Sequence, residues 1–198
     1  MNLWTVTLPV MRWEQLFADL EAQVAEQEAL AERAEDGSRA RAEHGRVRLA
    51  DRLRGAHGQE LTIGCTGAGQ LSGRLTDVGA DWLLLTDAQE RQVLVALPAV
   101  CSVTGLAALT APAVEEGSVA RALDLRRALR GLARDRVGVQ VLLADGTAPT
   151  GTIDRVGADF VELAEHPLDQ PRRRGAVTGV RALPLPAVVA VRTALAAG

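Results

Sequence analysis

Short runs of alternating apolar and polar residues begin at Glu60 and are separated by glycine, which is the pattern of β-strands joined by turns. Gly67-Ala68-Gly69 and Gly79-Ala80-Asp81 have the composition of turns. The spacing predicts a small, strongly bent β-structure. Its five predicted strands cover residues 61–65, 70–78, 82–86, 92–97 and 100–104.

The same pattern occurs a second time in the chain. Ser-Gly-Arg-Leu-Thr-Asp-Val-Gly-Ala-Asp-Trp at 72–82 aligns with Thr-Gly-Thr-Ile-Asp-Arg-Val-Gly-Ala-Asp-Phe at 150–160, a shift of 78 residues. Leu-Pro-Ala-Val at 97–100 recurs at 185–188, a shift of 88 residues. The second copy therefore gains ten residues between its third and fourth strands, and this insertion has the composition of an exposed basic loop.

Helical spacing of apolar residues precedes each copy. Before the first copy it begins at Trp13, and residues 13–36 contain eight acidic residues against Arg33 alone, so an acidic helical arm is predicted. A basic segment at 39–54 continues as a second helix, and either a hairpin or one long bent helix fits residues 12–57. Residues 118–133 predict the helix that leads into the second copy.

Each predicted module resembles the Sm-like small barrel, in which a helix precedes the first strand and a minimal turn joins the last two. The resemblance covers most of residues 46–106 and 120–192. It implies an α+β protein with N-terminal amphipathic helices followed by two tandem five-stranded Sm-like β-barrels, each preceded by a helix. The expected parts are an arm over 1–58 (1–10 extended or disordered), module 1 over 59–106, a linker and helix over 107–134 and module 2 over 135–198.

The family's RNA-binding residues are absent from both copies. Where that family places Asp and Asn around strands two and three, this chain has Gly79 and Leu83, or Gly157 and Val161. RNA-binding roles are therefore not transferred to these positions. The whole chain also resembles a group of actinobacterial proteins without an established activity, and that resemblance supplies no chemistry.

Composition and charge narrow the class of protein further. The 198 residues are 47% hydrophobic, which favours folded cores over disorder. No stretch has the length of a membrane span and the N-terminal residues lack a leader pattern, so a cytoplasmic protein without a membrane partner is expected. The net charge of -3 divides into -2 for residues 1–58, -5 for 59–117 and +4 for 118–198.

No arrangement of residues predicts catalysis, a metal site or a cofactor, and we expect a protein that is not an enzyme. Cys65 and Cys101 align with apolar Leu143 and Val189, so both are interpreted as reduced core residues. The three histidines, His44, His57 and His166, are interpreted as solvated. Asp81 and Asp159 follow Gly-Ala in the repeated turn and fit a turn role better than an acid-base role.

Trp82 and Leu84 carry the strongest sequence signal for a contact surface. Strand alternation places them opposite the core residues Leu83 and Leu85, on an outer apolar patch that something should cover. The N-terminal stripe, module 2 and another chain are the alternatives, and cover within the chain is favoured. The candidate protein-contact residues are Trp13, Phe17, Leu20, Trp82 and Leu84.

The leading hypothesis is a binding or scaffold protein that makes protein–protein contacts through the tandem modules and the acidic arm, with an unidentified protein partner or self-association. The alternative is a regulator that binds RNA or DNA through the arginine-rich surface of module 2. Against nucleic acid stand the net negative charge and an aromatic content of 3%. The candidate nucleic-acid contacts are Arg126, Arg127, Arg130, Arg172, Arg173 and Arg174.

Overall fold

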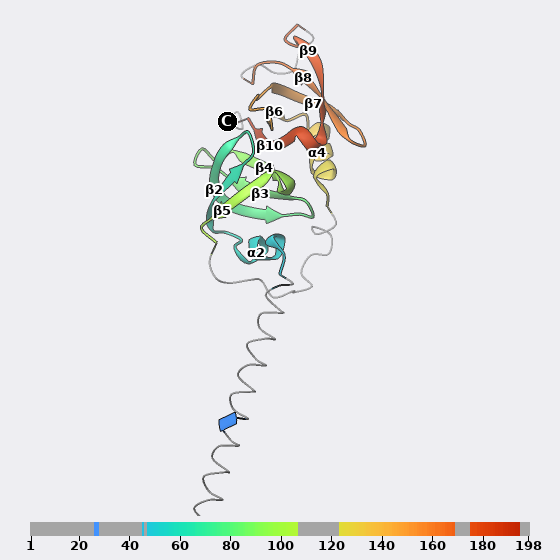
Figure 1. Ribbon diagram of the computed structural model, residues 1–198. Coiled ribbons are helices and arrows are strands. Elements are labelled where there is room, and N and C mark those ends of the chain that lie inside the picture. Colours follow the sequence, from blue (N-terminus) through green and yellow to red (C-terminus); the bar gives the residue numbers. More distant parts are fainter. Residues whose placement is uncertain (1–25, 28–44, 46, 107–122, 169–174, 195–198) are drawn as a thin grey trace, which may run out of the picture. The chain divides into compact units, whose positions relative to one another are not determined.

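The computed structural model describes residues 26–27, 45, 47–106, 123–168 and 175–194 (Figure 1). The chain divides into two units, residues 1–47 and 48–198, and every described strand belongs to the second unit. The predicted acidic arm lies outside the described residues except for 26–27, and of residues 12–57 the structure describes 26–27, 45 and 47–57, so the question of one helix or a hairpin stays open.

Each copy of the repeat forms a helix followed by five strands. The first half contains α2 (Leu49–Gly55), β1 (Glu60–Cys65), β2 (Gly69–Val78), β3 (Trp82–Thr86), β4 (Gln92–Ala96), the 3₁₀ turn η1 (Leu97–Ala99) and β5 (Val100–Thr104). The second half contains α4 (Leu125–Arg134), β6 (Gly138–Leu143), β7 (Thr150–Val156), β8 (Phe160–Glu165), β9 (Gly179–Pro184), η2 (Leu185–Ala187) and β10 (Val188–Thr193). The predicted strands are confirmed to within a few residues at their ends.

Strand registers confirm the internal repeat. Leu61 pairs with Gly73 in the first half, and Val139 pairs with Gly151 in the second, which is the same pairing 78 residues later. Both glycines are required for the same reason, because a Cβ there would collide with a backbone carbonyl of the neighbouring strand region. The two Leu-Pro-Ala segments form equivalent 3₁₀ turns, which confirms the shift of 88 residues.

The expected fold of N-terminal helices plus two five-stranded barrels is wrong. The ten strands form one antiparallel sheet in the order β5-β1-β2-β3-β4-β10-β6-β7-β8-β9 (Figure 1). The continuous sheet arises because β10 pairs with β4 of the first half as well as with β6 of its own half. In the described part of the chain, α2 and α4 are the α-helices with defined ends.

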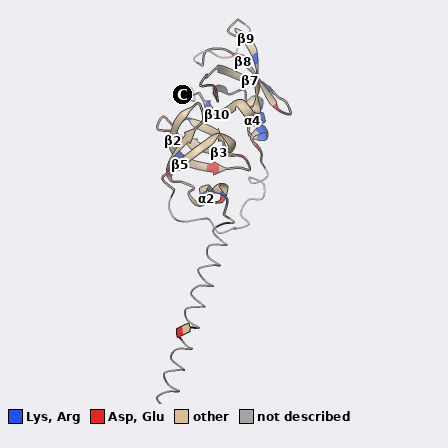
Figure 2. Cartoon of the chain, viewed as in Figure 1, with Lys and Arg blue, Asp and Glu red and all other residues tan. Residues whose placement is uncertain are grey.

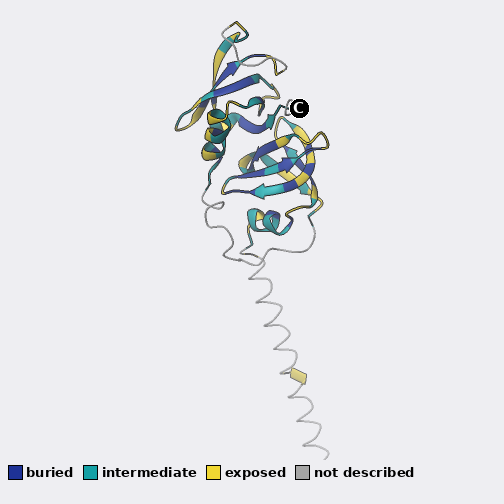
Figure 3. Cartoon of the chain, turned by 180° about the vertical axis from the view of Figure 1, so that it is seen from behind, coloured by how far each residue is buried: buried dark blue, intermediate teal, exposed yellow. Residues whose placement is uncertain are grey.

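The two hydrophobic cores share strands across this junction, which explains why two independent barrels do not form. Val189 and Ala190 of β10 pack in the first core, whereas Val188 and Val191 of the same strand pack in the second. A bulge between β10 and β6 accompanies this change of face. Buried residues consequently run through both halves (Figure 3). The first half also contributes to the second core through Trp82, Leu94 and Ala96.

Candidate protein interface

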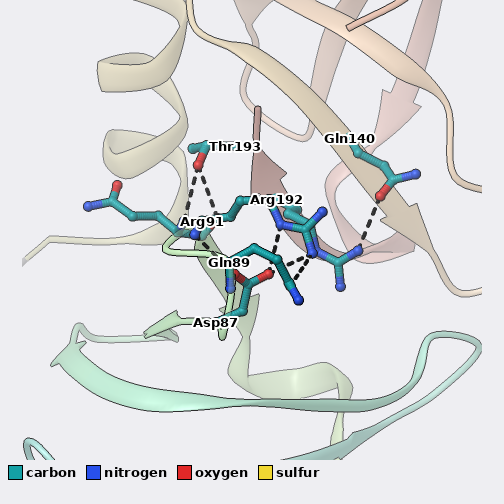
Figure 4. A network of polar contacts seen from close by, with 7 residues as sticks. Asp87, Gln89, Arg91, Gln140, Arg192 and Thr193 are labelled. Carbon is teal, nitrogen blue, oxygen red and sulfur yellow. Dashed lines mark hydrogen bonds and ion pairs between the residues drawn. The ribbon is translucent and has the colours of Figure 1, made fainter. Parts of the chain in front are cut away.

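The junction between β4 and β10 shows how one half of the molecule binds the other. Its backbone pairs are Ala190 with Val95, Val191 with Leu94 and Arg192 with Val93. At one end of the junction the Gln92 N–H donates to Thr193 Oγ1 at 3.1 Å, and Arg192 donates to the Gln140 side chain at 3.4 Å (Figure 4). The junction therefore combines a backbone ladder with side chains from two cores and a polar end.

The β3–β4 turn beside this polar end is held by Asp87. Its Oδ1 accepts from the Arg91 N–H at 3.0 Å and its Oδ2 accepts from Arg91 Nε at 2.8 Å (Figure 4). Burial by itself raises the pKa of Asp87, but the hydrogen bonds from Arg91 and from the Gln89 N–H, with the Arg91 charge, hold it below its usual value. The carboxylate thus fixes the start of β4.

Helix α4 packs against β7, and its first turn together with the preceding Leu123 contacts the outer side of β3. The Trp82 Nε1–H donates to the Leu123 carbonyl at 2.9 Å, and Asp81 Oδ1 accepts from the Leu125 N–H at 2.7 Å. Asp81 therefore satisfies one N–H of the first turn of α4, whose N-cap is Asp124, in addition to standing in the predicted turn. Leu125 and Leu129 of α4 pack in the second core with Trp82. The helix fastens the second half onto the first.

The predicted contact residues are thereby placed as follows. Trp82 is 5% exposed and Leu84 is half-buried, so cover within the chain, which the sequence favours, is confirmed for Trp82. The cover is α4, the helix that leads into the second half. Trp82 serves the internal junction, and Leu84 packs in part against the second core. Trp13, Phe17 and Leu20 lie outside the described residues.

Strands β5 and β9 are the two edges of the ten-stranded sheet, and among the described strands each pairs with a single neighbour. By the repeat, β5 is equivalent to β10 and β9 is equivalent to β4, so the edges correspond to the two strands that meet at the junction. Cys101 and Ser102 of β5 are exposed, whereas their equivalents Val189 and Ala190 are 1% exposed. The unpaired backbone of such edges is a template for another strand.

The outer face of β8 and β9 is partly exposed to solvent among the described residues. Phe160 is the equivalent of Trp82 but is 37% exposed, and Ala182, the equivalent of buried Leu94, is exposed. Val180 on β9 is 63% exposed. Neither this face nor the β5 edge was predicted as a binding surface from the sequence. The available signal is the position-by-position comparison of the two copies, which shows where their residue types differ. The sequence pattern does not indicate that β4 pairs with β10, so it could not predict which strands are the edges.

The arginines proposed as nucleic-acid contacts lie on a surface with many carboxylates. Arg127 and Arg130 are exposed on α4, while Arg126 donates to Asp124 and to the Ala158 carbonyl (Figure 2). Other exposed arginines of the second half also have acidic partners: Arg134 with Asp135, Arg136 with Asp154, Arg155 with Glu162 and Arg181 with Glu165. The Arg172, Arg173 and Arg174 segment lies outside the described residues.

Two interpretations of chemically active side chains need correction. Cys65 is buried as expected, but Cys101 is exposed, because β5 is an edge while the aligned Val189 lies between two strands. His166 is 4% exposed and not solvated. Its ring nitrogens contact Thr152 Oγ1 and the Pro167 carbonyl at 2.8 Å each, so the end of β8 folds the ring inward. His57 is exposed as expected, and His44 is outside the described residues.

A cavity of about 470 Å³ lies at the junction of the two halves. Its lining is mainly apolar and includes both 3₁₀ turns through Pro98 and Pro186. Asp81 and Arg126 are its charged residues, and both are already engaged with α4 or with neighbouring backbone. Both charged residues of the cavity are therefore engaged within the chain. For this reason we favour the sheet edges over the cavity as the binding site.

Over the described ranges, no group of three His, Cys, Asp or Glu side chains is gathered as a metal site would require. Among the helices in that part of the chain, none combines the length and apolar character needed to cross a bilayer. Comparison with known proteins found no family model, curated protein or solved structure that matches this chain.

Proposed function

We propose that this protein is a non-enzymatic scaffold that binds protein strands through the open edges β5 and β9 of its sheet. The observation that carries the proposal is that the two edge strands are the repeat equivalents of β10 and β4, which are paired at the junction. An added strand would extend the ladder by backbone hydrogen bonds, and the side chains of alternate residues would give selectivity.

The distribution of exposed apolar residues supports protein as the ligand. In the described part of the chain, large exposed hydrophobic residues include Phe160 and Val180 beside the β9 edge. A protein partner gains by covering such residues, whereas phosphates would be attracted by uncompensated positive charge. Ion pairs compensate many of the arginines on the second half. The cytoplasm is the proposed location, where the free Cys65 and Cys101 thiols stay reduced.

Site-specific photocrosslinking in the native cell tests this proposal. A photoreactive residue replaces Ser102 on β5 or Ala182 on β9, and the matched control replaces exposed Arg74 on β2, which is paired with Glu60 on one side and Thr86 on the other. We expect protein adducts from the two edges and none above background from the control. A Val180→Lys change on β9 should remove the Ala182 adduct, because edge lysines oppose strand addition.

Arg155→Lys, on the paired strand β7, should leave the Ala182 adduct unchanged. Edges that give no protein adduct above the Arg74 control would overturn the proposal. Adducts that disappear on nuclease treatment would overturn it in favour of RNA or DNA binding.

A further inference from the structure

We propose that the turn before β8, residues 157–159, together with Phe160 binds the first turn of an amphipathic helix from another protein. The ligand is a helix and not an added strand, so this inference goes beyond the proposed binding at the sheet edges. Its template lies within the chain, because the equivalent turn of the first half, residues 79–81, holds the start of α4.

In the first half, the turn makes three hydrogen bonds to the residues on either side of the α4 N-cap. The Leu123 carbonyl accepts from the Ala80 N–H at 3.2 Å and from the Trp82 indole N–H at 2.9 Å. Asp81 Oδ1 accepts from the Leu125 N–H at 2.7 Å. Leu125 is buried in the core that contains Trp82. The turn therefore binds a segment made of an apolar residue, an N-cap and a second apolar residue.

The turn of the second half has the same local geometry. The Gly157 N–H donates to the Phe160 carbonyl at 2.8 Å, and the Gly79 N–H donates to the Trp82 carbonyl at 2.9 Å. A Cβ on either glycine would collide with the aromatic ring that follows it, so each ring lies against the glycine of its own turn. The second half therefore presents its turn and its ring in the arrangement that holds α4 in the first half.

The groups that would bind the helix are accessible in the second half. Asp159 is exposed, and Phe160 is 37% exposed where Trp82, under α4, is 5% exposed. Among the described residues, the Ala158 N–H and the Asp159 carboxylate have no hydrogen-bond partner. Their equivalents in the first half are the two groups that bind the backbone on either side of the α4 N-cap. A helix from another protein would supply the missing partners.

Each turn also accepts a hydrogen bond from the helix of its own half, and this contact is compatible with docking. Arg54 of α2 donates to the Gly79 carbonyl at 3.2 Å, and Arg126 of α4 donates to the Ala158 carbonyl at 3.2 Å. The first turn binds α2 in this way and binds the start of α4 at the same time. At the second turn, α4 takes the part of α2, and the partner would take the part of α4.

The residue types at the second turn define the ligand. Phe160 has no indole N–H, so two polar contacts remain: the Ala158 N–H to the carbonyl before the N-cap, and Asp159 to the N–H after it. The carboxylate also favours the positive end of a helix dipole. The ligand is therefore a helix that starts with an apolar residue, an N-cap of Asp, Asn, Ser or Thr, and an apolar residue that covers Phe160.

Peptide binding to the full chain tests the site. The probe is a labelled peptide with the sequence of residues 123–134, capped at both ends, because this segment docks on the first turn. We expect saturable binding by fluorescence anisotropy, about tenfold weaker in Asp159→Ala. Phe160→Trp should tighten binding about fivefold, because it restores the indole N–H of the first turn. Ser102→Lys on the distant edge strand β5 is the control and should leave binding unchanged.

A second peptide tests the contact with Asp159 directly. Methylation of the backbone nitrogen at the position of Leu125 removes the hydrogen-bond donor and keeps the side chain. This change should weaken binding to the wild-type chain about tenfold and have little effect on binding to Asp159→Ala, which lacks the acceptor. Equal weakening in both proteins would overturn the proposal.

The proposal would also be overturned if the peptide showed no saturable binding at millimolar concentration. If Asp159→Ala unfolds, the Phe160→Trp variant decides, and unchanged affinity in that variant would contradict the site. Light scattering of the chain alone tests a different occupant. A mass above 20.9 kDa that returns to this value in Asp159→Ala would assign the turn to a second copy and overturn the choice of another protein. Photocrosslinking at the edges tests the proposed function independently of these results.

Discussion

Strands β5 and β10 are the same strand of the repeat in two environments. In β10, which lies between β4 and β6, Val189 and Ala190 are 1% exposed. In β5, at the sheet edge, the same positions are Cys101 and Ser102, and both are exposed. Apolar side chains stand where a second strand covers the position, and small or more polar ones stand where the described chain leaves the position exposed. The difference teaches that the place of a strand in the sheet, at an edge or between two strands, decides which residue type stands at an equivalent position.

The largest expected effect comes from placing a charge at this one repeated position. Val189→Asp buries a carboxylate without a partner in the first core, so it should lower the free energy of unfolding by about 5 kcal/mol. Cys101→Asp leaves the charge in water and should change it by less than about 0.5 kcal/mol. Urea denaturation of the monomeric chain measures both. Equal losses would show that the two strands do not differ in cover.

Removing the equivalent aromatic residues compares the covered outer face with the open one. Trp82→Ala deletes a buried side chain and its hydrogen bond to Leu123, so it should lower the free energy of unfolding by about 3–4 kcal/mol. Phe160→Ala should lower it by about 1 kcal/mol, because that ring is already 37% exposed. Denaturant midpoints measure the two losses, and a Phe160 loss as large as that of Trp82 would contradict the comparison.

A smaller effect is expected at a position where β2 and β7 differ. Thr152 is buried against His166, whereas its equivalent Arg74 is exposed. Thr152→Val leaves the buried ring nitrogen without its partner and should lower the free energy of unfolding by about 1–2 kcal/mol. Arg74→Val is the matched control and should be nearly neutral by the same denaturation measurement. Neutrality of Thr152→Val would mean that water replaces the hydroxyl.

The smallest effect concerns the two thiols. Burial raises the pKa of Cys65 to about 11, and the neighbouring Cys101 adds to the rise. Alkylation of the native chain at pH 8 should therefore modify exposed Cys101 and leave Cys65 until denaturant is added, as mass spectrometry would show. Rapid modification of Cys65 in the native chain would contradict its burial.

The same shift makes stability depend on alkaline pH. Because the pKa of Cys65 is higher in the folded state than in the unfolded state, the unfolded thiol loses its proton first. The contribution to stability is complete below about pH 9 and decreases as the pH rises towards about 11. Unfolding midpoints measured across this range should fall in the wild-type chain, and the fall should be smaller in Cys65→Val.

Local patterns predicted much of the sheet. The alternation around Leu61 and Ile63, the Gly-Ala-Asp turns and the Leu-Pro-Ala segments led to the strands and to their equivalence, which the structure confirms. The inward direction of Leu83 and Leu85 also followed from alternation and is confirmed by their full burial. These features were predictable because they depend on residues within about ten positions of one another.

The fold class and the candidate interface could not be predicted in the same way. The pairing of Val95 with Ala190 joins residues on opposite halves of the chain, and neither strand shows by its own pattern which edge it will meet. The alignment with apolar Val189 predicts a core position for Cys101, but it assumes that equivalent residues have equivalent neighbours. An edge strand does not meet that condition.

The amino-acid sequence by itself determined the duplicated unit, its strands, its turns and the opposite charges of the two halves, because propensity, alternation and composition are local properties. Only the tertiary structure decided that the two units form one sheet, that α4 covers Trp82, and that β5 and β9 remain open. Those outcomes depend on which apolar faces meet across about a hundred residues, where the free energy is set by mutual burial of distant side chains.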